Sequence, residues 1–367
     1  MDDGYFKHHE FPFICSAKKW TNRDTLKRDT LKCVLKKLIP QKSSRMGSPT
    51  VEVCSHESQG KAICENNTKL IVDNIFKQLS DNEKDEAAKA SSYRYLLASM
   101  SSKEEINDQR DQHAKATIMR FVTVEQKLNQ RHPNQWEQIA TVKLQKTLRY
   151  RNEKQIDAVR MCFDEDKRSD SSPHATLRKH LEDRFKAKAS IIRGYTNNGC
   201  ALFQNLPRAD TKDSNAWEEE IYIMGNIYMM ERALACTERK TNGNKDKIIV
   251  LYDYNGYAMK NSPPPLIVKH LLSDLREHWP ERLEHVFVID APFIFRAFWA
   301  IIKHFIDPIT SHLVQFISGE DQKKLLMDLI SEDQAAPYMY KNGKDIEEAD
   351  MKAFFYDIPF DRAYGQM

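Results

Sequence analysis

The chain has 367 residues, of which 41% are hydrophobic and 30% charged, and its formal net charge is +3. This length and composition predict a soluble protein with one two-part domain of about 230 residues and a polar extension. A net charge this small does not by itself indicate a nucleic-acid partner. The first residues lack a basic region followed by an apolar one, so we expect no secretion signal. The seven cysteines include no Cys-x-x-Cys pair, which favours reduced thiols in a cytoplasmic protein.

Residues 1–70 are predicted to form a basic, disordered extension. Between Lys18 and Arg45 there are ten Lys or Arg and only two Asp. The simplest interpretation is a solvated, partly disordered tail. The second is transient docking on an anionic membrane surface, to which each nearby Lys or Arg contributes about 1 kcal/mol. The third, binding of nucleic acid, is not expected. The candidate docking residues are Lys27, Lys32, Lys36 and Lys37.

Residues 71–165 carry helical patterns and are predicted to form a small bundle. From Trp136 to Tyr150 the apolar residues recur near helical spacing, as in an amphipathic helix. The stretch from Ser80 to Ala90 is polar and is interpreted as lying outside the helices. Further helical segments are expected at residues 68–79, 91–100, 118–122 and 156–163.

Residues 175–343 alternate strand and helix patterns, which predicts an α/β sandwich. Asn198-Gly199 is a strong hairpin signal between apolar runs that begin at Ile191 and Cys200. The continuous run Ile248–Tyr252 is typical of a buried parallel strand, and it ends at Asp253-Tyr254-Asn255-Gly256, a turn. Other strands are expected at 286–289 and 313–317, and helices at 217–236, 264–277 and 321–330. Residues 344–367 are assigned to a C-terminal tail.

An aromatic helix is predicted between Pro292 and Pro308. Its apolar residues cover most of the circumference, and Arg296 and Lys303 are the only charges. A helix that is apolar nearly all round is buried or lies against lipid, but this one is shorter than the roughly 20 residues that a membrane crossing needs. A core helix beneath a sheet and a movable lid both fit this pattern.

Several short motifs resemble the CRAL-TRIO, or Sec14-like, family. They are the turn Pro280-Glu281-Arg282, the strand end Asp290-Ala291-Pro292 and, last in the chain, the segment Lys303–Thr310. Weaker similarities in the helical block, at Thr117–Phe121 and Thr147–Asp157, precede them in the family's order. The resemblance implies a small N-terminal helical bundle followed by an α/β sandwich, with a hydrophobic lipid cavity and a gate helix.

The resemblance further implies a protein that binds one lipid in an internal cavity and exchanges it between membranes. The alternative is a sensor that presents a bound lipid to a protein partner without bulk transfer. The headgroup candidates are Glu281, Arg282 and Thr310, of which Glu281 and Thr310 match headgroup positions of the family. The candidates for the gate and the pocket wall are Phe293, Phe298, Trp299, Ile302, Phe305, Tyr252 and Val250.

The identity of the lipid stays open, because both headgroup sets of the family are incomplete here. Members that bind phosphatidylinositol have a lysine at the position of Leu313, and members that bind phosphatidylcholine have hydroxyls at the positions of Ile248 and Val250. A less polar ligand, such as a sterol, a tocopherol-like or a retinoid-like molecule, or a different phospholipid held from other positions, is therefore at least as well supported as phosphatidylinositol.

No catalytic activity, cofactor or metal is expected. The sequence contains no Gly-x-Ser-x-Gly, His-Glu-x-x-His, Gly-x-Gly-x-x-Gly or phosphate-loop motif. His8-His9-Glu10 has no third metal ligand nearby. Asp253 and Asp290 follow neighbouring strands and could form a carboxylate pair, but capping of the turn or helix after each is the favoured role.

Overall fold

The structure is a computed structural model, and it describes residues 57–91, 102–207, 217–257, 261–293, 295, 299, 303, 306, 308–330, 350 and 352–365. The basic segment with its candidate docking lysines lies outside this part of the chain. Its role at a membrane therefore stays a prediction.

The first described part is helical. Helix α2 begins at Glu57, ahead of residue 70, where the extension was expected to end. Residues 81–89 form helix α3, so the assignment of this polar stretch to a non-helical segment is wrong. Its first turn is a capping box, in which Ser80 and Glu83 bond reciprocally to each other's backbone N–H. The helices are α2 (Glu57–Gln78), α3 (Asp81–Lys89), α5 (Lys103–Leu128), α6 (Trp136–Glu153) and α7 (Ile156–Arg160).

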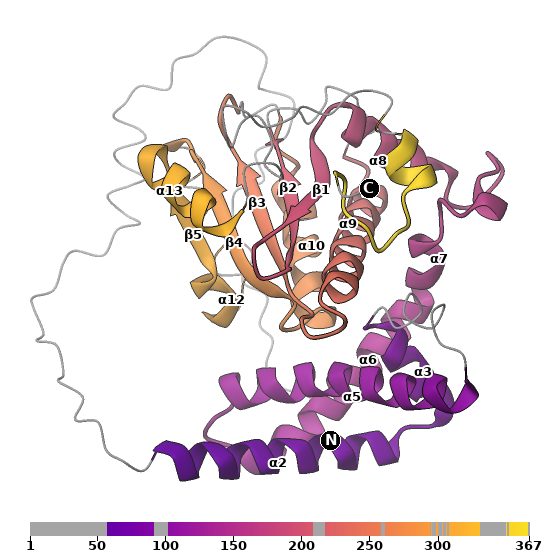
Figure 1. Ribbon diagram of the computed structural model, residues 1–367, viewed down its shortest axis with the longest axis vertical. Helices are drawn as coiled ribbons and strands as arrows, with labels where there is room; N and C mark the ends of the chain where they lie inside the picture. The colour runs from indigo at the N-terminus through magenta and orange to yellow at the C-terminus, as the bar shows by residue number, and fades with distance from the viewer. Residues whose placement is uncertain are drawn as a thin grey trace, which may run out of the picture. The chain divides into compact units, whose positions relative to one another are not determined.

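A five-stranded sheet with the order β1-β2-β3-β4-β5 follows (Figure 1). The expected hairpin is confirmed, because β1 and β2 are antiparallel and Gly199 between them has φ +92°. The other neighbours are parallel, as predicted for the run at 248–252. The strands are β1 (Ser190–Tyr195), β2 (Ala201–Asn205), β3 (Ile248–Asp253), β4 (Leu283–Ile289) and β5 (Val314–Ile317).

Helices pack against both faces of this sheet, which confirms the mixed α/β class. Leu326 and Ile330 pack on one face, against Leu202 and Ile249. The other face packs against α8, α9 and α10. In the described part of the chain, no helix combines the length and apolar character that a bilayer crossing needs. The helices are α8 (Ala175–Lys186), α9 (Glu219–Lys240), α10 (Pro265–His278), α12 (Pro308–His312) and α13 (Gly319–Leu329).

Residues 352–365, assigned from the sequence to a tail, pack into the core. Phe354 and Phe355 are buried, and the ring of Phe354 stacks on Phe185 at 5.0 Å. Arg232, on α9, donates to the carbonyl of Phe354 at 2.7 Å and lies 3.7 Å from the centre of its ring. Tyr364 N–H donates to the carbonyl of Ile192 on the edge strand β1 at 2.9 Å. This segment therefore belongs to the fold of the domain.

Candidate functional site

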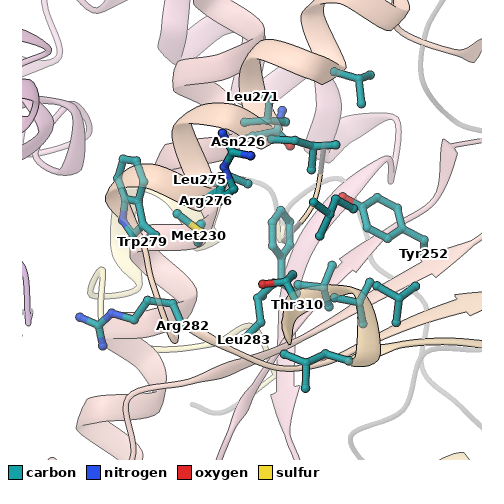
Figure 2. Close-up of a pocket in the computed structure, with 18 of the residues that line it drawn as sticks. Asn226, Met230, Tyr252, Leu271, Leu275, Arg276, Trp279, Arg282, Leu283 and Thr310 are labelled. Carbon is teal, nitrogen blue, oxygen red and sulfur yellow. The ribbon is translucent and has the colours of Figure 1, made fainter. Parts of the chain in front are cut away.

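A cavity of about 790 Å³ lies between the sheet and helices α9 and α10. Its size falls within the range of sites that enclose a small organic ligand. Figure 2 shows part of its wall, with Met230, Leu271 and Leu275 facing Tyr252 and Leu283 across the space. Most of the lining is apolar, so the cavity is suited to a lipophilic ligand.

The alternation of the strands explains why β3 can line the cavity and still support the opposite core. Ile248, Val250 and Tyr252 lie on the cavity face, whereas Ile249 and Leu251 pack with the residues beneath α13. Successive side chains of a strand point to opposite faces. A strand with apolar residues at consecutive positions is therefore buried on both sides.

Of the seven predicted pocket and gate residues, the structure places Val250, Tyr252 and Trp299 on the cavity wall. The Trp299 ring lies 5.6 Å from that of Phe316 on β5. Phe293 is 70% exposed and is not among the described residues that line the cavity. Phe298, Ile302 and Phe305 lie outside the described residues. Contact with a lipid and movement of a gate stay predictions.

The three predicted headgroup residues also line the cavity, near the amino ends of β3 and β4. The Glu281 carboxylate accepts hydrogen bonds from Lys127 Nζ at 2.7 Å and from Lys247 Nζ at 3.2 Å. Lys127 lies six residues after Phe121 on the same helix, α5. Sequence reasoning missed both lysines, because neither belongs to a matched motif.

Arg282 is buried in an ion cluster beneath this end of the cavity. Its guanidinium donates to Glu238 Oε1 at 3.1 Å and to the backbone carbonyl of Ala90 at 2.6 Å. Asp246 lies 3.4 Å from it and also pairs with Arg120 at 2.9 Å. The cluster therefore joins the helical bundle to the sheet domain, and the Arg282 charge is already compensated.

Glu238 is the weakly paired member of this cluster, and its protonation is expected to change stability. Burial raises the pKa of Glu238 to about 7, because its effect exceeds the opposing influence of Arg282 and Arg120. Its Oε2 has no hydrogen-bond partner within the described residues. A raised carboxyl pKa favours the folded state at low pH, so stability should fall as pH rises from about 4.3 to 7.

Glu238→Gln, which cannot ionise, is expected to remove this fall. The free energy of unfolding of the variant relative to wild type should rise by about 1–3 kcal/mol between pH 4.5 and pH 7.5, as measured by urea unfolding at each pH. Glu104→Gln, on the exposed first turn of α5, is the matched control and should show no such slope. If the free energy of unfolding of Glu238→Gln and that of wild type changed with pH in parallel, the raised pKa of Glu238 would be contradicted.

A second buried cluster supports the cavity wall. Glu231 on α9 accepts from Arg151 at 2.7 Å, from Arg160 at 2.7 Å and from the indole N–H of Trp279 at 2.6 Å. Trp279 in turn lines the cavity (Figure 2). The sequence indicated Arg151 only as part of a weak motif. Its partner lies 80 positions away along the chain.

Polar side chains also line the cavity at the carboxyl end of β2 and along α9. Asn205 and Asn226 line it together with Tyr222. Asn226 Nδ2 donates to the Tyr222 carbonyl at 2.8 Å. The Arg184 guanidinium lies 5.7 Å from the Tyr222 ring. Nothing in the sequence marked Asn205, whose position on the cavity face depends on the register of β2.

Two further sequence-based candidates concern metal ions and the carboxylate of Asp253. No group of three or more His, Cys, Asp or Glu side chains there could hold a metal ion. Asp253 Oδ1 accepts from the backbone N–H of Asn255 at 2.9 Å, which is the turn-capping role favoured for it.

A family model, sequence relatives and a solved structure are similar to parts of this chain. Residues 185–337 match the CRAL/TRIO domain family. The chain is 27% identical over 145 residues to a phosphatidylinositol transfer protein, CSR1, of Eremothecium gossypii, covering 38% of this chain and 30% of that one. It is 30% identical over 106 residues to an alpha-tocopherol transfer protein-like protein of Homo sapiens, covering 28% and 30%. A crystal structure of Sfh5 aligns with a TM-score of 0.43 and 18% identity, over 61% of this chain and 74% of that one. The matched part is thus under a third of the length of both sequence relatives.

Proposed function

We propose that this chain, which carries a CRAL/TRIO domain at residues 185–337, binds one lipid in its cavity and exchanges it between membranes. The observation that carries the proposal is the cavity of about 790 Å³ with its mainly apolar wall. Each methylene moved from a bilayer into water costs about 0.8 kcal/mol. A protein that encloses the chains removes most of this barrier. Relatives named phosphatidylinositol transfer protein and alpha-tocopherol transfer protein-like support the same function.

Exchange requires the protein to meet a membrane only transiently. The basic segment from Lys18 to Arg45 supplies ten cations for an anionic lipid surface. Attraction of this kind is screened by salt, so transfer to vesicles that contain phosphatidylserine should slow as ionic strength rises. Transfer that is independent of both salt and phosphatidylserine would leave this segment without a role at the membrane.

Native mass spectrometry of the purified protein, with lipid extraction of the same sample, tests the binding. We expect a single lipid at one molecule per chain, and transfer of that lipid between donor and acceptor vesicles. Stable retention without transfer would favour the sensor that presents its lipid to a partner. An empty protein that also takes up no lipid from mixed vesicles would overturn the proposed function.

The lipid class depends on which end of the cavity holds the polar group. Glu281, Arg282 and Thr310 would hold it at the amino ends of β3 and β4, where an anionic headgroup such as that of phosphatidylinositol would be expected. Tyr222 and Asn226 on α9 would hold it further along the cavity. The two orientations place the ester groups of a phospholipid in different surroundings, so they can be separated by experiment.

A further inference from the structure

The cavity reaches the protein surface beside the helical bundle. Lys127 and Leu128 on α5, Lys143 on α6 and Lys247 just ahead of β3 all line it. Each of the four is also between 37% and 42% exposed. Residues that line a cavity and meet solvent at the same time border an opening. The cavity therefore has a mouth between the bundle and the amino end of β3.

The ion pairs at this mouth expose their lysines and bury their carboxylates. Lys127 and Lys247 share Glu281, whose side chain is 10% exposed. Lys143 pairs with Glu125, whose side chain is 0% exposed. Because the carboxylates are buried and the lysines are not, the surface around the mouth is positive although each of the three lysines is paired. A surface of this kind attracts anions.

Lys115, on the same helix as Lys127, has a different arrangement. Its side chain is likewise 42% exposed, but that of its partner Asp73 is 46% exposed. This pair therefore presents both signs of charge to solvent. The outward positive charge is a property of the mouth and not of α5 as a whole.

Two half-exposed carboxylates, Glu277 and Asp246, also lie near the mouth. Glu277 pairs with Lys146, whose side chain is 54% exposed. Asp246 pairs with Arg120 and Arg282. Both negative charges are thus balanced locally, and the positive charge of the three lysines at the mouth remains.

Two exposed apolar residues adjoin these lysines. Leu128 follows Lys127 and is 40% exposed, and Val142 precedes Lys143 and is 58% exposed. The ion pair of Lys143 with Glu125 joins this part of α6 to the last turn of α5. Apolar side chains flanked by cations are typical of protein surfaces that lie in the interface of an anionic bilayer.

We propose that the surface formed by Lys127, Leu128, Val142, Lys143 and Lys247, the basic rim, docks on an anionic lipid bilayer, and that the lipid enters and leaves the cavity through the mouth it borders. This inference rests on the lipid exchange proposed above, and it adds the face of the protein at which exchange occurs. A lipid that passes directly from the bilayer into the mouth keeps its chains out of water, so the cost of hydrating its methylenes is avoided.

A polarity-sensitive fluorescent amino acid at position 142 of the full chain tests the docking. Vesicles of phosphatidylcholine and phosphatidylserine should shift its emission to shorter wavelength, and raised salt should weaken the shift. Leu70, on α2, is also 58% exposed, so the same label at position 70 is the matched control and should show no shift. No shift at position 142 on vesicles that carry the protein, or an equal shift at both positions, would overturn the proposal.

Single substitutions in the basic rim test its part in exchange. Val142→Glu should slow transfer to phosphatidylserine vesicles about tenfold, because an apolar contact with the bilayer is replaced by a charge that the bilayer repels. Leu70→Glu should transfer lipid as wild type does. Lys127→Gln should reduce the salt dependence of transfer, whereas Lys115→Gln, at an equally exposed position of the same helix, should leave it unchanged. Wild-type transfer and salt dependence in both Val142→Glu and Lys127→Gln would contradict the proposal.

These measurements separate the docking from the proposed function. If wild type transfers lipid while the label at position 142 shows no shift, the basic rim is not the docking surface and the proposed function stands. If the label shifts but native mass spectrometry finds no lipid in the protein after incubation with the vesicles, the proposed function fails, and the route of the lipid through the mouth fails with it.

Discussion

Replacing Glu231 by alanine is expected to lower the free energy of unfolding by about 3–5 kcal/mol, because two buried cations lose their common partner. The side chains of Arg151 and Arg160 are 4% and 1% exposed, and both donate to this one carboxylate. The Trp279 indole N–H would also lose its acceptor. Urea unfolding at pH 7 measures the change.

A control variant separates this effect from the general loss of a surface charge. Glu220 pairs with Lys154 at 3.2 Å, but its side chain is 69% exposed. Glu220→Ala should therefore change the free energy of unfolding by less than about 0.5 kcal/mol. A loss below about 1 kcal/mol for Glu231→Ala would show that the two arginines find other partners or water.

The same cluster is expected to make the free energy of unfolding of wild type fall at acid pH. Burial alone would raise the pKa of Glu231, but the charges of Arg151 and Arg160 outweigh it and lower this pKa to about 2. A carboxyl group whose pKa is lowered by folding stabilises the protein at pH values above its pKa in the unfolded chain, about 4.3. This stabilisation is lost as the pH falls from about 4.3 towards 2. Glu231→Ala lacks the carboxylate, so the difference between variant and wild type should shrink over that pH range.

The sheet could be predicted from the sequence because its signals are local. The run at 248–252 is continuous and β-branched, and Asn198-Gly199 marks the hairpin within a few residues. Helix α3 was missed because its residues are nearly all polar. Its start is encoded instead in the capping box of Ser80 and Glu83, a two-residue signal within a charged stretch. The family resemblance supplied the cavity, which no periodicity could have shown.

The pairings within the site could not be predicted, because they join residues that lie far apart in the chain. Lys127 reaches Glu281 across 154 positions, and Arg282 reaches the Ala90 carbonyl across 192. Arg232 similarly holds the C-terminal segment through the carbonyl of Phe354, 122 positions away. A motif identifies the residue type at one position, whereas its partner depends on how helices and strands pack in three dimensions.

Placing a carboxylate at Trp299 should abolish lipid loading while leaving the fold intact. Trp299 lines the cavity and packs beside Phe316 on β5. In Trp299→Glu the lipid chains would lie against an ionised group without a buried partner, which costs several kcal/mol in an apolar site. We expect at least a tenfold loss of bound lipid by native mass spectrometry. The circular dichroism spectrum should match that of wild type, because Trp299 is only partly buried.

Leu70→Glu provides the matched control, since it adds the same charge to an apolar residue outside the cavity. Leu70 is 58% exposed on helix α2, and this variant should load lipid as wild type does. Because only the position of the new carboxylate differs, a loss confined to Trp299→Glu would locate the bound lipid against this part of the wall. Normal loading in Trp299→Glu would remove Trp299 from the ligand contact and, with it, the assignment of residues 293–305 as a gate.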